Sequence, residues 1–353
     1  MRNNLHFTPL FAFLKSMAYF ADGYRKTRND LQEYLAIRYA LCLVGGVMLK
    51  YTLKRVLMLI PTIIGISLFI YLIMSFVPGD PVELLMPQEA TFEQKEALRA
   101  EMGLDQPVLV QYVKYMWGVV HGDFGISWFT KQPVMDEIRS RMPYTLTLGL
   151  LSTLITTFIS IPLGTLTAVK HNSLTDYVVT FLCLLFAAMP GFWLGILLQI
   201  YLSLQTGWLP AYGIKSMRHF VLPVMAACAA SVGTNIRSTR TWMLDVIRSD
   251  FVRTARAKGA SEFTVIMKHA LRNALLPIIT SLGSAFAGVL GGSVVIETVF
   301  AIPGISSYLT SAVKTRDMPI IMGCILVISI FVGVVNLLVD LMYSVIDPRV
   351  KFE

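Results

Sequence analysis

The residues best suited to chemistry lie in one short basic stretch, residues 251–277. Its cationic side chains are Arg253, Arg256, Lys258, Lys268 and Arg272. Each charge would cost roughly 2.5–3.5 kcal/mol at the centre of a membrane helix, so this stretch must lie in water although long apolar runs flank it. Arginine forks are suited to binding carboxylates of a partner. We predict that Gly259 divides the stretch into two short helices, which form an elbow.

The residue patterns of catalytic and metal sites are absent from the sequence. The four cysteines lie in apolar runs without CxxC spacing, which indicates small buried hydrophobes rather than disulfides or metal ligands. No GxxxxGK[ST] motif is present to cradle a nucleotide phosphate. Basic and aromatic residues do not alternate as they do in a groove that binds single strands. We therefore expect no enzyme activity, no metal, no cofactor and no nucleic-acid binding in this chain.

The composition is that of an integral membrane protein. Of 353 residues, 55% are hydrophobic and only 15% are charged. About 20 apolar residues cross a bilayer, and six runs reach or approach that length: 56–77, 142–169, 177–214, 220–236, 273–296 and 318–339. The sequence therefore predicts an all-α protein with six transmembrane helices. The third run should end at residues 207–210.

Prolines inside these runs predict where the helices bend. Pro61 and Pro277 fall in the first turns of their runs, where the missing N–H is tolerated. Pro162, Pro190 and Pro223 lie deeper and should kink their helices. Kinked helices suit a bundle that lines a pathway, although they are common in membrane helices in general.

The distribution of charge predicts the sidedness of the spans. Residues 237–272 carry eight basic and three acidic residues, whereas residues 80–141 carry six basic and ten acidic ones. Because basic loops stay in the cytoplasm, we expect both termini and the elbow to be cytoplasmic. The expected organisation is an extension (1–47), a first span (48–77), an extracytoplasmic insertion (78–141), a core (142–346) with the elbow at about 245–272, and a tail (347–353).

The insertion should have helical structure of its own. Thr91 and Gln94 form the pattern of a capping box, Gly103 should end that helix, and Pro107 should begin a second helix that reaches about Val120. A loop then follows, made of His121, Gly122, Asp123, Phe124 and Gly125. This segment is either a small cap that packs on the spans or a vestibule beneath a delivery protein, and periodicity alone leaves both open.

Several motifs together resemble a known family. They are LKRVLMLIPT (53–62), PGDP (78–81), HGDFGIS (121–127), RTARAKG (253–259), HALRNALLP (269–277), VIETVF (295–300) and DPR (347–349). From residue 48 onward the chain resembles inner-membrane permease subunits of peptide/nickel-type ABC importers. The resemblance implies the type I importer fold, a second similar permease, two ATPase subunits that hold ATP and Mg, and an extracytoplasmic solute-binding protein.

The resemblance also implies a role for the elbow, as the coupling helix that docks on an ATPase subunit. The matching residues are Arg253, Thr254, Ala255, Arg256, Ala257, Lys258 and Gly259. Alanines there would allow close approach, and Gly259 can adopt the left-handed conformation that turns the chain back. The alternative is a basic amphipathic helix that lies on anionic lipid.

The fifth span carries small residues at helical spacing, among them Ser284, Gly288, Gly291 and Gly292. They allow close helix approach, either within this chain or, as the resemblance implies, along the pathway and against the partner permease. Glu297, at the outer end, is either a functional carboxylate or one that extends to the membrane interface.

We therefore expect a non-enzymatic conduit in the inner membrane of a bacterium, in contact with lipid and opened by ATP hydrolysis on partner subunits. Peptides are the expected substrate, with nickel chelates or another small solute as the alternative. A stand-alone ion-driven transporter is the alternative of a different class, although the spans lack the mid-membrane charges typical of it. Residues 1–47 fall outside the resemblance, and we interpret them as a loose surface helix or an upstream mis-start.

Overall fold

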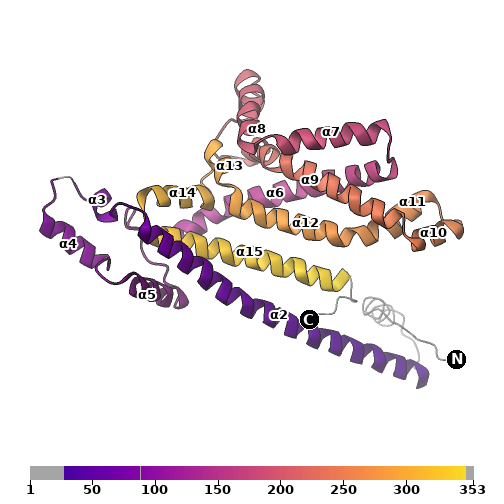
Figure 1. Ribbon diagram of the computed structural model, residues 1–353, viewed down its shortest axis with the longest axis horizontal. Helices are drawn as coiled ribbons and strands as arrows, with labels where there is room; N and C mark the ends of the chain where they lie inside the picture. The colour runs from indigo at the N-terminus through magenta and orange to yellow at the C-terminus, as the bar shows by residue number, and fades with distance from the viewer. Residues whose placement is uncertain (1–27, 88, 347–353) are drawn as a thin grey trace. The chain divides into compact units, whose positions relative to one another are not determined.

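The chain is almost entirely helical over the residues that our computed structural model describes, 28–87 and 89–346, with side chains described for 52–87 and 89–342 (Figure 1). The first half comprises α2 (Arg28–Phe76), α3 (Pro81–Leu85), α4 (Phe92–Glu101), α5 (Val108–Val120), α6 (Val134–Val169), α7 (Leu174–Ala188), α8 (Gly191–Leu198) and η1 (Gln199–Gln205). The second half comprises η2 (Met217–Phe220), α9 (Val221–Ile247), α10 (Asp250–Ala257), α11 (Glu262–Thr264), η3 (Val265–Ala270), α12 (Leu271–Gly292), α13 (Val294–Val299), α14 (Ile305–Thr315) and α15 (Met318–Ile346).

The chain separates into two compact units, residues 62–335 and residues 1–61 with 336–353. In the second of these, Arg55 Nη1 lies 3.2 Å from Asp340 Oδ2, so an ion pair joins α2 to α15. Residues 1–27 and 347–353 of the expected extension and tail lie outside the described residues. Residues 28–47 belong to α2 and are helical without a break into the first span.

The helices are long and apolar enough for a multi-pass membrane protein. Five of them qualify as spans by length and composition: Thr52–Phe76, Val134–Val169, Met217–Ile247, Glu262–Gly292 and Met318–Met342. A sixth is made by the pair Leu174–Ala188 and Gly191–Gln205 if that bent pair counts as one span. The prediction of an all-helical membrane protein is confirmed, and its six spans are found when the bent pair is counted as one span.

The third span is broken rather than kinked. Its two halves meet at an angle of 97° on either side of Met189 and Pro190. With 15 residues, α7 is about 22 Å long and falls short of a hydrocarbon core of about 30 Å. The sequence predicted the position of the bend at Pro190 but not its size. Gly207, with φ +64°, follows the second half, as predicted.

Pro162 lies deep inside α6, as predicted, but three other prolines do not lie where the apolar runs predicted. Pro223 lies in the first turn of α9 and therefore does not kink it, whereas Pro61 and Pro277 lie well inside their helices. Pro61 and Pro277 lie deep because their helices begin ahead of the apolar runs, in polar sequence, as α6 does by beginning at Val134 rather than near residue 142. Membrane helices tolerate such internal prolines because neighbouring groups satisfy the freed carbonyls.

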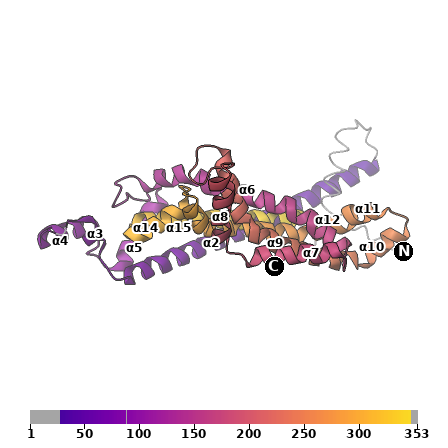
Figure 2. The same ribbon diagram turned by 90° about the horizontal axis from the view of Figure 1, so that it is seen from above.

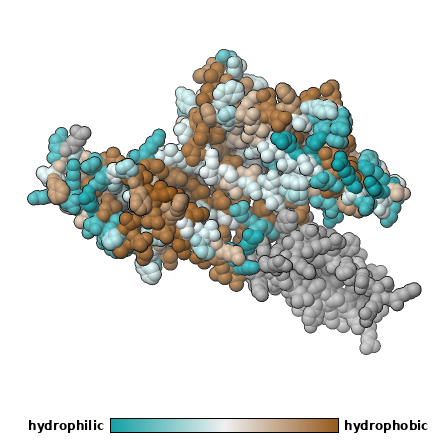
Figure 3. Space-filling model, viewed as in Figure 1, coloured by the Kyte–Doolittle hydropathy of each residue, from teal (hydrophilic) through white to brown (hydrophobic). Residues whose placement is uncertain are grey.

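Within residues 62–335, the insertion and the elbow lie at opposite ends of the helices α6, α9 and α12. Figures 1 and 2 both place α10 and α11 at one end, and α3 and α4 at the other. Figure 3 shows hydrophilic surface at both ends and much hydrophobic surface between them. This arrangement fits a bundle that crosses a bilayer and exposes the elbow and the insertion to water on different sides.

The insertion forms the helices that the sequence predicted. Thr91 and Gln94 make a complete capping box, Gly103 (φ +69°) follows α4, and Pro107 directly precedes α5. Arg99 on α4 forms an ion pair with Asp80, the N-cap of α3. These contacts give the insertion a defined shape.

Candidate functional site

The elbow is anchored to the bundle through one apolar side chain of α10. Val252 is fully buried in a cluster that includes Ala168 of α6, Met243 of α9 and Val265 of η3. Only two residues, 248 and 249, separate α9 from α10. α10 is therefore both packed against the ends of neighbouring helices and closely tethered to α9.

The turn of the elbow depends on Gly259. Its φ is +80°, the left-handed region in which a side chain is strained. The Gly259 N–H donates to Arg256 O at 2.9 Å, and the Ala260 N–H donates to Ala255 O at 3.3 Å. This pair of bonds is a Schellman motif, which satisfies the last carbonyls of α10. The break at Gly259 is where the sequence predicted it, and α10 is the short helix before it. The prediction of a second short helix is wrong, because α11 continues directly through η3 into α12.

The basic side chains of the elbow lie on its exposed face. Arg253 is 75% exposed and makes only a long ion pair to Asp250, at 3.7 Å. Arg256, in contrast, uses its fork within the chain, because its Nη2 and Nε donate to the two carboxylate oxygens of Glu262 at 2.6 and 3.1 Å. This hydrogen bonding raises the pKa of the Arg256 guanidinium. The sequence assigned both arginines to carboxylates of a partner, whereas the structure pairs Arg256 with Glu262.

Sequence reasoning missed two exposed aromatic side chains beside these charges. Phe251 is 46% exposed and Phe263 is 75% exposed. An exposed aromatic side chain beside arginines is typical of the centre of a protein interface. The only signal in the sequence was two phenylalanines within a basic segment, and such residues are more often buried.

The small residues of α12 face outward from this chain. Ser284, Gly288, Gly291 and Gly292 are all exposed. A Cβ added at any of these three glycines would meet no atom within 4 Å. The alternative that these residues pack a helix of the same chain is therefore wrong for the described residues. The surface remains available to another molecule.

Glu297 is a buried carboxylate that is hydrogen-bonded within the chain, and its side chain does not extend to the surface. Its side chain is fully buried, and it accepts hydrogen bonds from Thr145 Oγ1 (2.7 Å), Ser293 Oγ (2.8 Å) and the Ser307 N–H (2.8 Å). Thr145 Oγ1 also accepts from the Ile305 N–H at 2.9 Å. The carboxylate thus fastens α13 and the start of α14 to α6.

The loop at 121–125 is an ordered turn at the end of α5. Gly122 and Gly125 have positive φ (85° and 78°), and Asp123 Oδ1 accepts a hydrogen bond from the Gly125 N–H at 2.8 Å. Phe124 packs into the core, while His121 and Asp123 are exposed.

Two adjoining cavities of about 320 and 300 Å³ lie beside this loop and the rest of the insertion. Their shared lining is Tyr71, Gln111, Trp128 and Met318. The insertion therefore presents a hollowed, mixed polar and aromatic surface.

No group of three or more His, Cys, Asp or Glu side chains suited to a metal ion occurs among the described residues. Cys183, Cys228 and Cys324 are free and buried, as the sequence predicted. The described part of the chain thus presents an exposed basic elbow, an open small-residue face on α12 and the hollow beside the insertion, which we call the outer hollow.

Comparison with known proteins gives the chain its family. Residues 160–352 match the family "Binding-protein-dependent transport system inner membrane component", and residues 48–149 match the corresponding N-terminal family. The oligopeptide transport system permease protein AppB of Bacillus subtilis is 39% identical over 316 residues, which cover 86% of this chain and all of AppB. The glutathione transport system permease protein GsiC of Escherichia coli K12 is 39% identical over 306 residues, 87% of this chain and all of GsiC.

A putative peptide transport system permease protein of Brucella abortus is 38% identical over 309 residues, 85% of this chain and 98% of that protein. A chain of a solved amino acid ABC transporter aligns at 18% identity and a TM-score of 0.41, over 61% of this chain and 95% of that chain, which is too distant to carry an argument. The family matches together cover most of the chain, and the relatives align along nearly their whole length. The chain therefore belongs to the family of inner membrane components of binding-protein-dependent transport systems.

Proposed function

We propose that this chain is the permease subunit of an ATP-driven ABC importer and forms half of its translocation pathway. Family membership supports this function, and the elbow is the structural observation that carries it. An exposed basic helix, anchored at Val252 and turned by Gly259, is suited to receive a push from another protein. The chain itself is a gated conduit, and ATP with its Mg is bound and hydrolysed on two ATP-binding subunits.

The elbow is the contact with one of those subunits. The residues that make it are Arg253, Thr254, Ala255, Arg256, Ala257, Lys258 and Gly259, of which all but Ala255 are exposed. Phe251 and Phe263 extend the same surface. The apolar side of α10 is occupied by the chain's own core through Val252. That packing favours docking on a protein over the alternative, in which α10 would bury its apolar face in lipid.

Two further surfaces serve the remaining partners. The open face of α12 at Ser284, Gly288, Gly291 and Gly292 meets a second, homologous permease, since small residues allow helices to approach closely. The outer hollow and the loop at His121–Gly125 receive an extracytoplasmic solute-binding protein. Glu297 contributes indirectly, because it holds α13 and α14 at the outer end of α12.

Peptides are the substrate class that the relatives favour, because the names of AppB and GsiC specify oligopeptide and glutathione transport. A nickel chelate or another small solute carried by the same machinery is the alternative. The complex lies in the inner membrane of a bacterium with both termini and the elbow in the cytoplasm, as the excess of basic residues at 237–272 supports.

Mild detergent extraction of the tagged chain, followed by mass spectrometry of stoichiometric partners, tests this function. We expect a second permease and ATP-binding subunits to co-purify, and ATP hydrolysis by the purified complex. Recovery of the chain alone, under conditions that keep a control importer intact, would favour a stand-alone transporter and contradict the proposal.

A further inference from the structure

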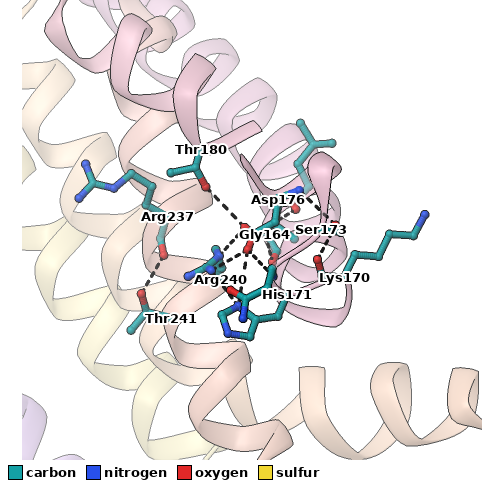
Figure 4. Close-up of polar contacts among 12 residues, drawn as sticks. Gly164, Lys170, His171, Ser173, Asp176, Thr180, Arg237, Arg240 and Thr241 are labelled. Atoms are coloured by element: carbon teal, nitrogen blue, oxygen red, sulfur yellow. Dashed lines mark hydrogen bonds and ion pairs between the residues drawn. The ribbon is translucent and has the colours of Figure 1, made fainter. Parts of the chain in front are cut away.

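An ion pair between a buried carboxylate and a partly exposed arginine joins α7 to α9 at the elbow's end of the bundle. The Asp176 side chain is only 3% exposed, and Arg240 donates from Nε to Oδ1 at 2.7 Å and from Nη2 to Oδ2 at 2.8 Å. Figure 4 shows both groups pointing toward each other between their helices, with His171 alongside. We call His171, Asp176 and Arg240 the clasp.

The clasp also fixes the loop between α6 and α7. The Asn172 N–H donates to Asp176 Oδ2 at 3.0 Å, with Asn172 in the left-handed region at φ +61°. Arg240 Nη2 lies 3.0 Å from His171 Nδ1, which must accept this hydrogen bond because a guanidinium has no acceptor. One arginine of α9 therefore binds both the loop and the first turn of α7.

Close backbone packing continues the same connection along the helices. A Cβ at Gly164 of α6 would lie 2.6 Å from Cβ of Thr239 on α9. A Cβ at Gly233 of α9 would lie 2.5 Å from the backbone oxygen of Cys183 on α7. Because α9 touches both neighbours at glycines and the clasp ties the ends, α6, α7 and α9 have little freedom to slide past one another.

Of these three helices, α9 leads directly to the elbow. α9 ends at Ile247, and α10 begins at Asp250. Ser249 between them donates its hydroxyl to Val246 O at 2.6 Å, and Val252 packs with Met243 of α9. A displacement of α10 therefore acts on α9 through this short connection, and on η3 and α6 through the cluster around Val252.

We propose that the clasp is a positioning element of coupling, which makes α6 and α7 follow α9 when a partner displaces α10. This inference rests on the proposed function. Separation of the two groups would leave the buried Asp176 carboxylate without its charged partner, which is strongly destabilising, so a movement of α7 away from α9 is opposed here. The clasp thus converts a push on one helix into a movement of three.

Dipolar EPR on the complete complex tests this inference without knowledge of the transported solute. In a background that lacks the native cysteines, spin labels are placed at Phe181→Cys on α7 and Thr234→Cys on α9, both exposed positions. Spectra are taken without nucleotide and with trapped ADP–vanadate. With the clasp intact we expect the same α7–α9 distance in both states. With Asp176→Asn we expect the ADP–vanadate state to show a shifted or broadened distance.

Arg237→Gln is the matched control, because Arg237 is exposed, lies on the same helix three residues before Arg240 and points away from Asp176 in Figure 4. We expect it to leave both spectra unchanged. The double variant Asp176→Asn/Arg240→Gln should add little to the shift of either single one, because the two groups act through each other. Arg240→Lys keeps the charge but loses the fork, so its distance shift should lie between those of the intact chain and Asp176→Asn. This variant replaces Asp176→Asn in the test if Asp176→Asn assembles poorly.

Three results would overturn the inference. One is an Asp176→Asn spectrum that matches the intact chain in both states, and another is a change of the α7–α9 distance in the intact chain itself. The third is a loss of thermal stability in Asp176→Asn and Arg240→Lys without any nucleotide-dependent shift, which would make the clasp purely structural. Failure of the proposed function would look different, because no ATP-binding subunit would be present in the purified sample.

Discussion

Substitution of Gly259 tests whether the elbow acts as a lever. A non-glycine residue in the left-handed region costs roughly 1–2 kcal/mol, and φ at Gly259 is +80°. An added Cβ would meet no atom within 4 Å, so this cost is purely a backbone cost. It corresponds to a roughly 5- to 30-fold smaller population of the observed turn. Valine should have the largest effect, alanine a smaller one and asparagine the smallest, because asparagine tolerates this conformation best.

The assay measures ATP hydrolysis and uptake of tritiated tri-alanine by the same reconstituted complex. For Gly259→Val we expect hydrolysis to persist while the uptake per ATP falls. Gly207→Val is the matched control, because Gly207 has φ +64°, a turn bond from its N–H to Ser203 O and no atom within 4 Å of an added Cβ, but lies after η1, outside the elbow and the outer hollow. It should leave the uptake per ATP unchanged.

Two results would refute the reasoning on Gly259. Full uptake per ATP in Gly259→Val would show that the turn does not transmit force. An equal loss in valine, alanine and asparagine variants would show that φ is not the cause. A loss in the Gly207 variant that matches the loss in the Gly259 variant would assign the effect to general destabilisation.

Three further predictions follow from the buried and exposed groups. Glu297→Ala leaves buried donors unpaired and should lower the free energy of unfolding by about 3 kcal/mol. The measurement is the unfolding temperature in detergent, which should fall. An unchanged unfolding temperature would contradict the role of Glu297 in fastening α13 and α14 to α6. Gly288→Leu should leave the isolated chain stable but reduce recovery of the second permease, whereas Gly233→Ala, which meets a backbone oxygen of α7, should destabilise the chain itself. Arg256→Gln and Glu262→Gln should each change the free energy of unfolding by less than about 1 kcal/mol, because the pair is exposed. Arg256→Gln should nevertheless lower the uptake per ATP more than Glu262→Gln does. The reverse order would count against a partner contact at Arg256.

The elbow was predictable from sequence because its signals are local. Charge within an apolar chain, a glycine at a helix end and the RTARAKG motif all lie within a few residues, and the structure places Gly259 at the corner as expected. The six apolar runs are equally local. The break at Pro190 was predictable in position, but its angle of 97° depends on how α8 packs on other helices.

The clasp and the Glu297 network were beyond local reasoning. Asp176 and Arg240 are 64 residues apart, and Thr145 and Glu297 are 152 residues apart. Only the folded chain brings such pairs together. The sequence alone left open whether Glu297 is functional or extends to the membrane interface. Its burial could not be predicted, because it depends on contacts with α6 and α14.

Photo-crosslinking from the elbow in native membranes tests the central claim most directly. A photoreactive amino acid replaces Arg253, which is 75% exposed, and for comparison Lys114, an exposed residue of α5 in the insertion. We predict adducts with an ATP-binding subunit from position 253 and none from position 114. Adducts with lipid alone from position 253, or ATP-binding subunit adducts from position 114, would contradict the account.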